Sequence, residues 1–569
     1  MSTQISKREL FSKHALSTGL GVGALALLPQ RASADAPFTN FAFTATGAPT
    51  PRTMPDRLGE IKNVKDYGAV GNGVTDDTAA IQACFDAAFG TWDSPHGGTP
   101  DVGPNQNSPV FFPGGVYLVA SKFAARSITG CANDGTGKIR LTVSTSGLVN
   151  GDIVYVRGVT GTTFANGSYS IADVDATHLT LRNSQFNADW TGGGTICPPA
   201  LRIRSLQGGH IFGAGRLASI IHSATNNAAV ISTNGYAYTK IENMSFSGSV
   251  GGIAFDLNCD GTGTVNLQSN FFDNVNFGGT ASTGVDYGCT VGMGMSMGSE
   301  NTFLNCYFAG GDIAALYFHN YNSLANTVIG GNIASAKIGI WNHAGACPLI
   351  HSVSFQNYQV AGQIADIYIE NGAWDSYHIA ACRTESANFL KTGAPQTFAV
   401  DACSQTNPGA PGFFFSGAGY VTLTNCQSVE GYIEGNPHLI INNCKFGRSD
   451  YLTTGTENFE YLQINPMPIT QRTDASYTIK SADGGTKIQF NRAAAQTVTL
   501  LKNSDYSCRL GAGTKIEVQQ TGTGQTRFQG AAGVTIRSAN GLKLRAQYSC
   551  AVLTCDGADT WTLTGDLAV

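Results

Sequence analysis

Six short segments of the chain, 253–257, 316–319, 340–343, 367–370, 413–416 and 431–434, share one alternating pattern. Aliphatic or Phe residues alternate with other residues, and in a β-strand the two sets would point to opposite faces. The first outward residues are Ala254, Tyr317, Trp341, Tyr368, Phe414 and Tyr432, and the second are Asp256, His319, His343, Glu370, Ser416 and Glu434. Aromatic rings stack on sugars, whereas carboxylates and imidazoles bind hydroxyls or move protons. The pattern predicts a glycan-binding groove, unless loops or neighbouring subunits cover the aromatic side chains.

Glycoside hydrolysis is one chemistry that these residues could perform. It needs two carboxyl groups roughly 5–9.5 Å apart, on either side of the scissile bond. Glu370 is a good candidate for one of them. Asp366 could be the other, although the two Cα atoms would lie ~13 Å apart along one strand. Glu385 or Asp375 from the next repeat is a better partner for Glu370.

Elimination by a lyase is the other chemistry, and it needs a base and a cation or Arg beside a uronate carboxylate. His319, His343 and Tyr368 are the candidate bases. Arg383 and Glu385 follow the next bend of the chain, around a corner from the predicted groove. Contacts with the substrate are expected from Tyr317, Trp341, Tyr368, Phe414, Tyr432, Asp256, Glu434 and Arg383.

A second repeat indicates the elements that would position these side chains. An Asn or small residue is followed by an apolar residue, often Cys, and then often by Phe two positions later. Its clearest copies lie at 243–246, 274–277, 305–308, 425–426 and 443–446. The spacing from copy to copy is between 18 and 31 residues. Short β-like repeats of this length are typical of a solenoid.

The Asn of this repeat is predicted to lie at a bend. In residues 421–426 both Leu423 and Cys426 favour the core, yet strict alternation would place them on opposite faces. A bend at Thr424-Asn425 resolves the conflict, and Asn tolerates the left-handed conformation that such a bend needs. The Cys residues that follow the bend then form an inward column of buried thiols, namely Cys306, Cys382, Cys403, Cys426 and Cys444.

The segment 63–82 precedes the repeats and has the form of a capping unit. Asp76 or Asp77 can cap a helix that starts at the run Ala79-Ala80-Ile81-Gln82, and Pro113-Gly114-Gly115 turns into a strand. This block resembles the opening of the pectate lyase-like superfamily, which includes polygalacturonase-related proteins and phage tailspikes. The resemblance implies an all-β fold, a right-handed parallel β-helix with a helical end cap and an asparagine ladder. It also implies that substrates lie along the strand that carries the predicted groove.

The motifs of true polygalacturonases, Asn-Thr-Asp, Gly-His-Gly and Arg-Ile-Lys, do not occur in the sequence. A tight Asp cluster of the calcium-dependent pectate lyase type is also missing. Pectin cleavage is therefore a poor prediction. Neither chemistry requires a cofactor, although Ca²⁺ could take part.

The chain divides into five predicted parts. Residues 1–36 resemble a bacterial export signal, with Lys7-Arg8 before a weakly apolar run. Residues 37–127 would form the cap and first rungs, 128–197 a small inserted β domain, 198–460 the β-helix and 470–569 a C-terminal all-β module. The insert would act as a spacer or as an extra wall for sugar contacts. The C-terminal module resembles those of phage tail proteins and could cap the solenoid or drive trimerisation. Cys131 with Cys197, and Cys550 with Cys555, are candidate disulfides.

Composition limits the classes of partner. The net charge is −5 and no basic stripe occurs, which argues against nucleic acid. No apolar run is long enough to span a membrane. We therefore expect a protein that is secreted, periplasmic, on the cell surface or carried on a phage virion. Its expected function is to bind and cleave a polysaccharide, as a glycoside hydrolase or polysaccharide lyase. The alternative is a tailspike-like adhesin that binds glycan without cutting it.

Overall fold

The computed structural model describes residues 42–44, 49–90, 108–203, 206–259, 267–278, 285–292, 298–319, 323–357, 360–370, 376–393, 396–406, 412–428, 431–446, 459–461, 469–502, 505, 510–557 and 559–569. The chain forms two compact units, Met1–Ile61 and Lys62–Val569. In the first unit, β1 (Ala42–Phe43) pairs with β2 (Arg52–Thr53), and α2 (Met54–Leu58) follows directly. The predicted export signal lies outside the described residues. No helix in the described ranges is long and apolar enough to cross a membrane.

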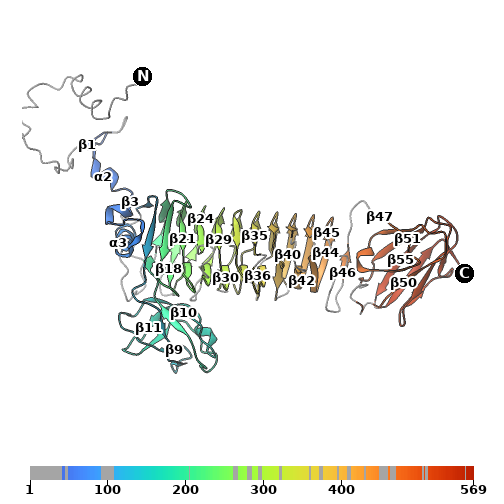
Figure 1. Cartoon of the computed structure of the whole chain (residues 1–569), viewed down its shortest axis with the longest axis horizontal. Coiled ribbons are helices and arrows are strands. Elements are labelled where there is room, and N and C mark those ends of the chain that lie inside the picture. The colour runs from blue at the N-terminus through green and yellow to red at the C-terminus, as the bar shows by residue number, and fades with distance from the viewer. Residues whose placement is uncertain are drawn as a thin grey trace, which may run out of the picture. The chain divides into compact units, whose positions relative to one another are not determined.

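The second unit contains a parallel β-helix, as predicted, and its rungs are stacked along the solenoid in Figure 1. A complete rung contributes one strand to each of three faces, and the rungs at the two ends contribute fewer. Face 1 consists of β14 (Leu201–Ile203), β18 (Ala229–Thr233), β22 (Ile253–Leu257), β26 (Tyr287–Val291), β30 (Ala314–Phe318), β33 (Ile338–Asn342), β36 (Ala365–Ile369), β39 (Leu390–Thr392) and the first halves of β42 (Phe413–Thr424) and β44 (Tyr432–Asn442).

Face 2 follows face 1 along the chain. Its strands are β3 (Lys62–Asn63), β5 (Val110–Phe112), β16 (His210–Gly213), β20 (Lys240–Glu242), β24 (Phe271–Asp273), β28 (Thr302–Leu304), β31 (Thr327–Ile329), β34 (Leu349–His351), β37 (Tyr377–Ala380), β40 (Gln396–Asp401), the second halves of β42 and β44, and β46 (Phe459–Tyr461). A narrow sheet lies between these faces in chain order, made of β15 (Leu206–Gln207), β19 (Tyr236–Ala237), β23 (Leu267–Gln268) and β27 (Gly298–Ser299).

Face 3 is a sheet of 12 parallel strands that completes each rung. Its strands are β4 (Asn72–Asp76), β6 (Gly115–Val119), β17 (Ser219–Ser223), β21 (Ser245–Ser247), β25 (Asn276–Gly278), β29 (Tyr307–Ala309), β32 (Asn332–Ala334), β35 (Ser354–Gln356), β38 (Arg383–Thr384), β41 (Ser404–Gln405), β43 (Gln427–Ser428) and β45 (Lys445–Phe446).

The bends between faces 2 and 3 have the predicted left-handed backbone. Asn243, Asn274, Asn305, Asn425 and Asn443 all have φ between 51° and 56°. Their amides stack across rungs: Asn274 Nδ2 donates to Asn243 Oδ1 at 2.8 Å, and Asn443 Nδ2 donates to Asn425 Oδ1 at 2.7 Å. The bend residues therefore form the expected ladder.

The solenoid interior is one continuous apolar core of stacked side chains. The predicted cysteine column belongs to it, and each thiol donates to a backbone carbonyl of its own or a neighbouring rung. An interior ladder that the sequence analysis missed runs through Asn270, Asn301 and Asn326, whose amides are linked at 2.9 Å. These buried polar groups satisfy one another, as the low polarity of the interior requires.

One end of the solenoid carries α3 (Thr78–Phe89), whose Ile81, Cys84 and Phe85 are buried in the core. A short 3₁₀ helix, η2 (Val64–Tyr67), packs beside it. The Asp76 carboxylate accepts the backbone N–H of Thr78 at 2.9 Å, while Asp77 accepts Val70 N–H and Gly71 N–H. The Asp-Asp pair thus has the structural role that was predicted.

The inserted domain is an antiparallel sheet with its own apolar core. Its sheet order is β7-β13-β10-β11-β12-β9-β8. The elements are β7 (Arg126–Ser127), β8 (Gly130–Asn133), β9 (Ile139–Thr142), β10 (Ile153–Arg157), η3 (Thr163–Ala165), β11 (Gly167–Ala172), β12 (His178–Leu181) and β13 (Thr195–Cys197).

The C-terminal region forms a further all-β domain with a separate core around Trp561. It has a six-stranded and a five-stranded sheet. The elements are β47 (Ile469–Arg472), β48 (Ser476–Thr478), η4 (Ser481–Asp483), β49 (Lys487–Phe490), β50 (Gln496–Leu500), β51 (Lys515–Gln520), β52 (Thr526–Gly530), β53 (Thr535–Arg537), β54 (Lys543–Leu544), β55 (Cys550–Gly557), β56 (Thr560–Gly565) and β57 (Leu567–Ala568). The predicted fold class, with its two accessory β domains, is confirmed.

Both predicted disulfides are wrong, because all four cysteines remain thiols. Cys550 and Cys555 lie on one extended strand, β55, so their Cα atoms are ~16 Å apart and beyond the reach of a disulfide. Cys131 and Cys197 lie on β8 and β13, which are separated by four strands in the order of the sheet. The Cys197 thiol instead donates to the Ser121 hydroxyl and the Phe123 carbonyl.

Candidate functional site

The outward side chains of face 1 form one column in strict register. Strand pairing aligns Ser232, Asp256, Thr290, Tyr317, Trp341, Tyr368, Lys391, Ser416 and Glu434. Tyr317, Trp341 and Tyr368 are consecutive in this column, and we call them the aromatic strip. Tyr317 was predicted to contact substrate, but it is buried against the inserted domain, so that prediction is wrong and only Trp341 and Tyr368 are accessible. The ring centroids of the strip are 4.7 Å apart for Tyr317 and Trp341, and 6.1 Å apart for Trp341 and Tyr368. Neighbouring parallel strands lie ~4.8 Å apart, so the strip follows the rungs.

Beside the aromatic strip, the next outward position holds His319, His343 and Glu370, as predicted. Ser416 and Glu434 were predicted for this same position but align with Tyr368 instead. The backbones at this position are linked rung to rung, since His343 N–H donates to Phe318 O and Glu370 N–H donates to Asn342 O. Glu370 Oε2 accepts the indole N–H of Trp341 at 3.1 Å and is hydrogen-bonded to His343 Nδ1. The side chains of His343 and Glu370 are 34% and 32% exposed, so solvent or a ligand can reach the pair.

His319 extends this column toward the preceding rung. Its ring stacks on that of His343 with a centroid separation of 5.5 Å. Burial and the neighbouring His343 lower the pKa of His319 to about 4. His319 is therefore neutral at neutral pH, and its Nδ1 has no hydrogen-bond partner among the described residues. A neutral imidazole can donate or accept a hydrogen bond at the site but carries no charge.

Lys391 is a site residue that the sequence analysis missed. Lys391 lies one rung after Tyr368 and aligns with it, and its Nζ lies 5.4 Å from the centre of the Tyr368 ring. The side chain places a positive charge beside the aromatic strip. Aligning Leu390 with Ile367 as inward residues would have revealed it, because Lys391 then falls on the outward position.

Asp366 was predicted to be catalytic, but it lies inside the solenoid. Its side chain is 0% exposed and accepts hydrogen bonds from Asn357 at 2.8 Å, Gln363 at 3.2 Å, Ser386 at 2.5 Å and the Thr384 hydroxyl. Burial raises the pKa of this carboxyl to about 7. Asp366 is thus a polar component of the core and is not accessible to a glycan on face 1.

Phe414 was predicted to contact substrate, but it also lies in the core, where it packs on Phe389. The cause is the same as for Asp366. Strand pairing aligns Ile367, Leu390 and Phe415, so Asp366, Phe389 and Phe414 occupy equivalent positions. Two consecutive residues of each face 1 strand point inward, and strict alternation fails at that point. Ala254, which was grouped with the aromatic residues, is buried for the same reason.

Asp256 was predicted to align with Glu370. Strand pairing instead aligns it with Tyr368, two residues earlier on that strand. Asp256 is fully buried, and its carboxylate accepts hydrogen bonds from Ser168 of the inserted domain at 2.6 Å and from Ser232 and Thr290 of adjacent rungs at 2.8 and 2.7 Å. Burial raises its pKa. The predicted contact between Asp256 and substrate is therefore wrong.

The other predicted residues lie away from the Glu370–His343 pair. Arg383 belongs to β38 on face 3 and pairs with Glu385 at 2.6 Å. Glu434 accepts a hydrogen bond from Ser416 at 3.4 Å and lies three rungs beyond Tyr368, or ~14 Å along the solenoid. The side chain of Tyr432, and Asp375 as a whole, lie outside the described residues.

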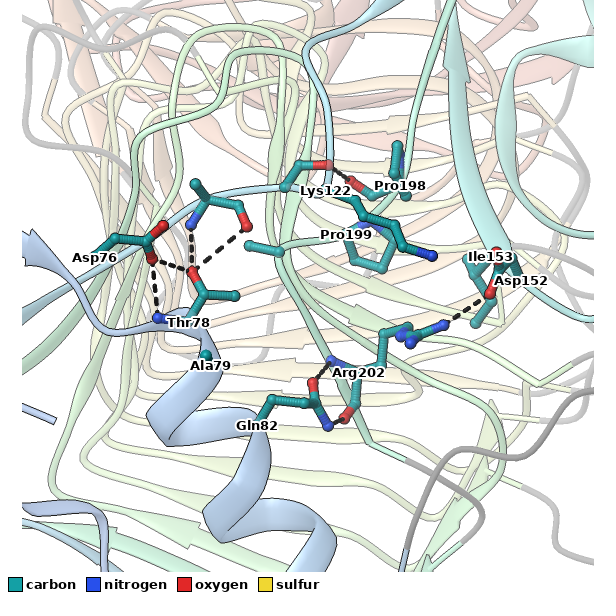
Figure 2. A pocket seen from close by; sticks show the side chains of 13 residues that line it. Asp76, Thr78, Ala79, Gln82, Lys122, Asp152, Ile153, Pro198, Pro199 and Arg202 are labelled. Atoms are coloured by element: carbon teal, nitrogen blue, oxygen red, sulfur yellow. Dashed lines mark hydrogen bonds and ion pairs between the residues drawn. The ribbon is translucent and has the colours of Figure 1, made fainter. Parts of the chain in front are cut away.

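A separate cavity of about 470 Å³ lies where the first turn of α3 meets the inserted domain (Figure 2). Its polar groups bond to one another: Arg202 pairs with Asp152 at 2.7 Å, and Gln82 exchanges two hydrogen bonds with the backbone of Arg202. These contacts fix the insert to the end cap. The parts of the chain that the structure describes hold no cluster of three or more His, Cys, Asp or Glu residues that could bind a metal ion.

Comparison with known proteins finds a family match in the N-terminal part of the chain. Residues 61–192 match the family described as rhamnogalacturonase A/epimerase, pectate lyase-like. The chain carries a pectate lyase-like domain. Mannuronan C5-epimerases AlgE5 and AlgE2 of Azotobacter vinelandii are 48% identical to the chain over 58 residues, which are 10% of the chain and 4% of each epimerase. The match thus spans a small fraction of those relatives.

Several solved structures resemble the chain at low sequence identity. ORF18 of Geobacillus virus E2 is 12% identical, with a TM-score of 0.33 over 91% of this chain and 81% of its own. The Agl-KA catalytic domain is 12% identical, with a TM-score of 0.37 over 77% and 64%. The tailspike gp61 of Pseudomonas phage phi297 is 12% identical, with a TM-score of 0.21 over 78% and 80%.

Proposed function

We propose that the protein binds an acidic polysaccharide along the exposed part of the aromatic strip, Trp341 and Tyr368, and cleaves it by elimination, with the Glu370–His343 pair moving the proton. The observation that carries this proposal is the position of that pair. The Glu370 carboxylate is held by Trp341 and His343, is partly exposed, and lies directly beside two half-buried aromatic rings. Sugar rings stack on such side chains, so a bound glycan would lie within reach of the pair.

The arrangement of carboxyl groups favours elimination over hydrolysis. A hydrolase needs two carboxyl groups roughly 5–9.5 Å apart at the scissile bond. Asp366 lies inside the core, Glu385 lies on face 3 and Glu434 lies three rungs beyond the strip. Among the described residues, none of the predicted carboxyl partners thus shares the exposed part of face 1 with Glu370 at a suitable distance.

The roles in the elimination follow from charge. The Glu370–His343 pair removes the proton on the carbon that carries the uronate carboxyl group, and Lys391 stabilises the negative charge that develops on that group. The electrons of the broken C–H bond form a C=C bond, the glycosidic C–O bond breaks, and the proton taken up by the pair passes to the leaving oxygen, directly or through water. Ca²⁺ could assist by binding the same carboxylate. The protein groups themselves are held by contacts with one another.

The second candidate function is binding without cleavage, as in a tailspike-like adhesin that acts as a homotrimer. It uses the same aromatic strip and needs no proton transfer. The partly exposed strip and Lys391 support this function equally, since both serve binding. The location, whether exported or carried on a virion, belongs to the proposal as well.

A panel of mannuronan, polygalacturonate and α-1,3-glucan tests the proposed function, with and without EDTA. A lyase generates new reducing ends together with ultraviolet absorbance from the conjugated C=C bond. Glu370→Gln should abolish cleavage while binding persists. Reducing ends without absorbance would contradict elimination, and binding by the wild type without any new ends would establish the adhesin.

A further inference from the structure

We propose that the inserted domain closes one end of the aromatic strip, so that the protein holds a polysaccharide by one chain end. The terminal sugar would lie at Trp341, and the rest of the chain would run along Tyr368 and Lys391 toward β44. This inference rests on the proposed binding function and adds to it the part of the glycan that is recognised.

The exposure of the outward column changes abruptly along face 1. Asp256 and Thr290 are 0% exposed and Tyr317 is 5% exposed, whereas Trp341 and Tyr368 are half-buried. All five side chains point outward from the same sheet in continuous register. The cover over the first three therefore ends between Tyr317 and Trp341.

Direct contacts identify this cover as the inserted domain. Ser168 on β11 donates to Asp256 at 2.6 Å, and its backbone carbonyl accepts Asn258 Nδ2 at 3.1 Å. Tyr155 on β10 packs in one apolar cluster with Tyr317 and its neighbours Tyr287, Ala314 and Ile338. The insert thus occupies the surface that the aromatic strip would otherwise continue along.

Buried polar groups hold this contact between the insert and the solenoid. Arg157 forms a fork with Asp286, with distances of 2.7 and 2.9 Å, and the Tyr155 hydroxyl donates to the same carboxylate at 2.7 Å. Asp286 and Asp256 are 1% and 0% exposed. Opening this contact would strip both buried carboxylates of their donors from the insert, which is unfavourable for charged groups.

The other direction along face 1 is open in the described residues. Lys391, Ser416 and Glu434 continue the column beyond Tyr368 and are half-buried. A glycan on the strip can therefore extend only away from the insert. Its terminal sugar contacts the ring of Trp341, and internal sugars of a longer chain cannot occupy that position.

Binding stoichiometry tests this inference directly. Full-length protein carrying Glu370→Gln, which prevents cleavage, is titrated calorimetrically with size-fractionated chains of the panel polysaccharide that binds. Recognition of chain ends predicts one protein bound per chain for short and long fractions alike. Recognition of internal sugars would instead make the number of proteins per chain rise in proportion to length, and that result would overturn the inference.

A matched pair of variants separates failure of the inference from failure of the proposed function. Trp341→Ala should weaken binding of every fraction by about tenfold or more, whereas Tyr420→Ala, at an exposed aromatic residue of β42 outside the outward column of face 1, should not. If no fraction binds to any protein, the proposed function itself is wrong. If binding depends on Trp341 but the stoichiometry rises with length, only the recognition of chain ends is wrong.

Discussion

Replacing Asp366 with Asn should change the way in which stability depends on pH. In the folded protein, burial raises the pKa of Asp366 from 3.8 to about 7. The folded state therefore binds a proton more tightly than the unfolded state does. The contribution of Asp366 to stability is fully present below about pH 4 and is lost as the pH rises toward 7.

The magnitude follows from the shift in pKa. Each pKa unit corresponds to about 1.4 kcal/mol, so a shift of about three units amounts to roughly 4 kcal/mol of lost stability between pH 4 and pH 7. The amide side chain of the Asp366→Asn variant would be neutral throughout, and the Thr384 and Ser386 hydroxyls can rotate to accept hydrogen bonds from it. The variant should lack this loss, although it also lacks the charge-assisted hydrogen bonds.

Urea unfolding of wild type and Asp366→Asn, followed by circular dichroism from pH 4.5 to pH 8, measures this effect. The free energy of unfolding of the wild type minus that of the variant should fall by roughly 3 kcal/mol over this range, since the titrations of other groups cancel. Asp312→Asn, at an exposed position, is the control and should show no such trend. A difference that stays flat or increases with pH would mean that the four donors keep Asp366 ionised, and the reasoning would be refuted.

Three further substitutions test the rest of the structure. Arg157→Ala should lower the free energy of unfolding by about 2 kcal/mol, after allowance for the partial exposure of the guanidinium, because Asp286 loses its charged partner. Proteases should then cut the insert faster, and an unchanged rate of cleavage would contradict this. Ala402→Asn should stabilise the protein by about 1 kcal/mol, since Ala402 has φ of 50° and Asn tolerates that conformation. The same change at Ala399 in the extended strand β40 should not raise the melting temperature, and an equal gain there would argue against the backbone effect. Lys391→Ala should weaken binding of an acidic polysaccharide by about fivefold and reduce its salt dependence; an unchanged salt dependence would remove Lys391 from the site.

The bends and the core were predictable from local patterns. Asn243 and Asn425 adopt the left-handed conformation because the chain must bend there to turn the apolar residues on both sides into the core. This requirement is visible within two or three residues, and Cys426 lies in the core as expected. The same register correctly placed Trp341, His343 and Glu370 together on the outside of face 1.

The errors arose where non-local packing decides the orientation. Asp366 and Phe414 point inward because each face 1 strand has two consecutive inward residues, which period-two reasoning cannot detect. Gly339 aligns with Asp366 on the preceding rung, and a side chain there would meet the ring of Phe355. That crowding is visible only once the rungs are stacked.

The burial of Asp256 by the inserted domain also could not be predicted from the sequence. The donor Ser168 lies 88 residues away in another domain, and no repeat links the two. The sequence did indicate that an extra wall for sugar contacts could come from the insert, but the surface on which it packs is set by the tertiary structure.

The central claim is that the exposed part of the aromatic strip binds polysaccharide. It is tested most directly by calorimetric titration of wild type, Trp341→Ala and Tyr420→Ala with the panel polysaccharide that binds, after circular dichroism has shown that both variants are folded. Loss of the stacking surface at Trp341 should weaken binding by about tenfold or more, with Tyr420→Ala close to wild type. Equal affinity of Trp341→Ala and wild type would contradict the account.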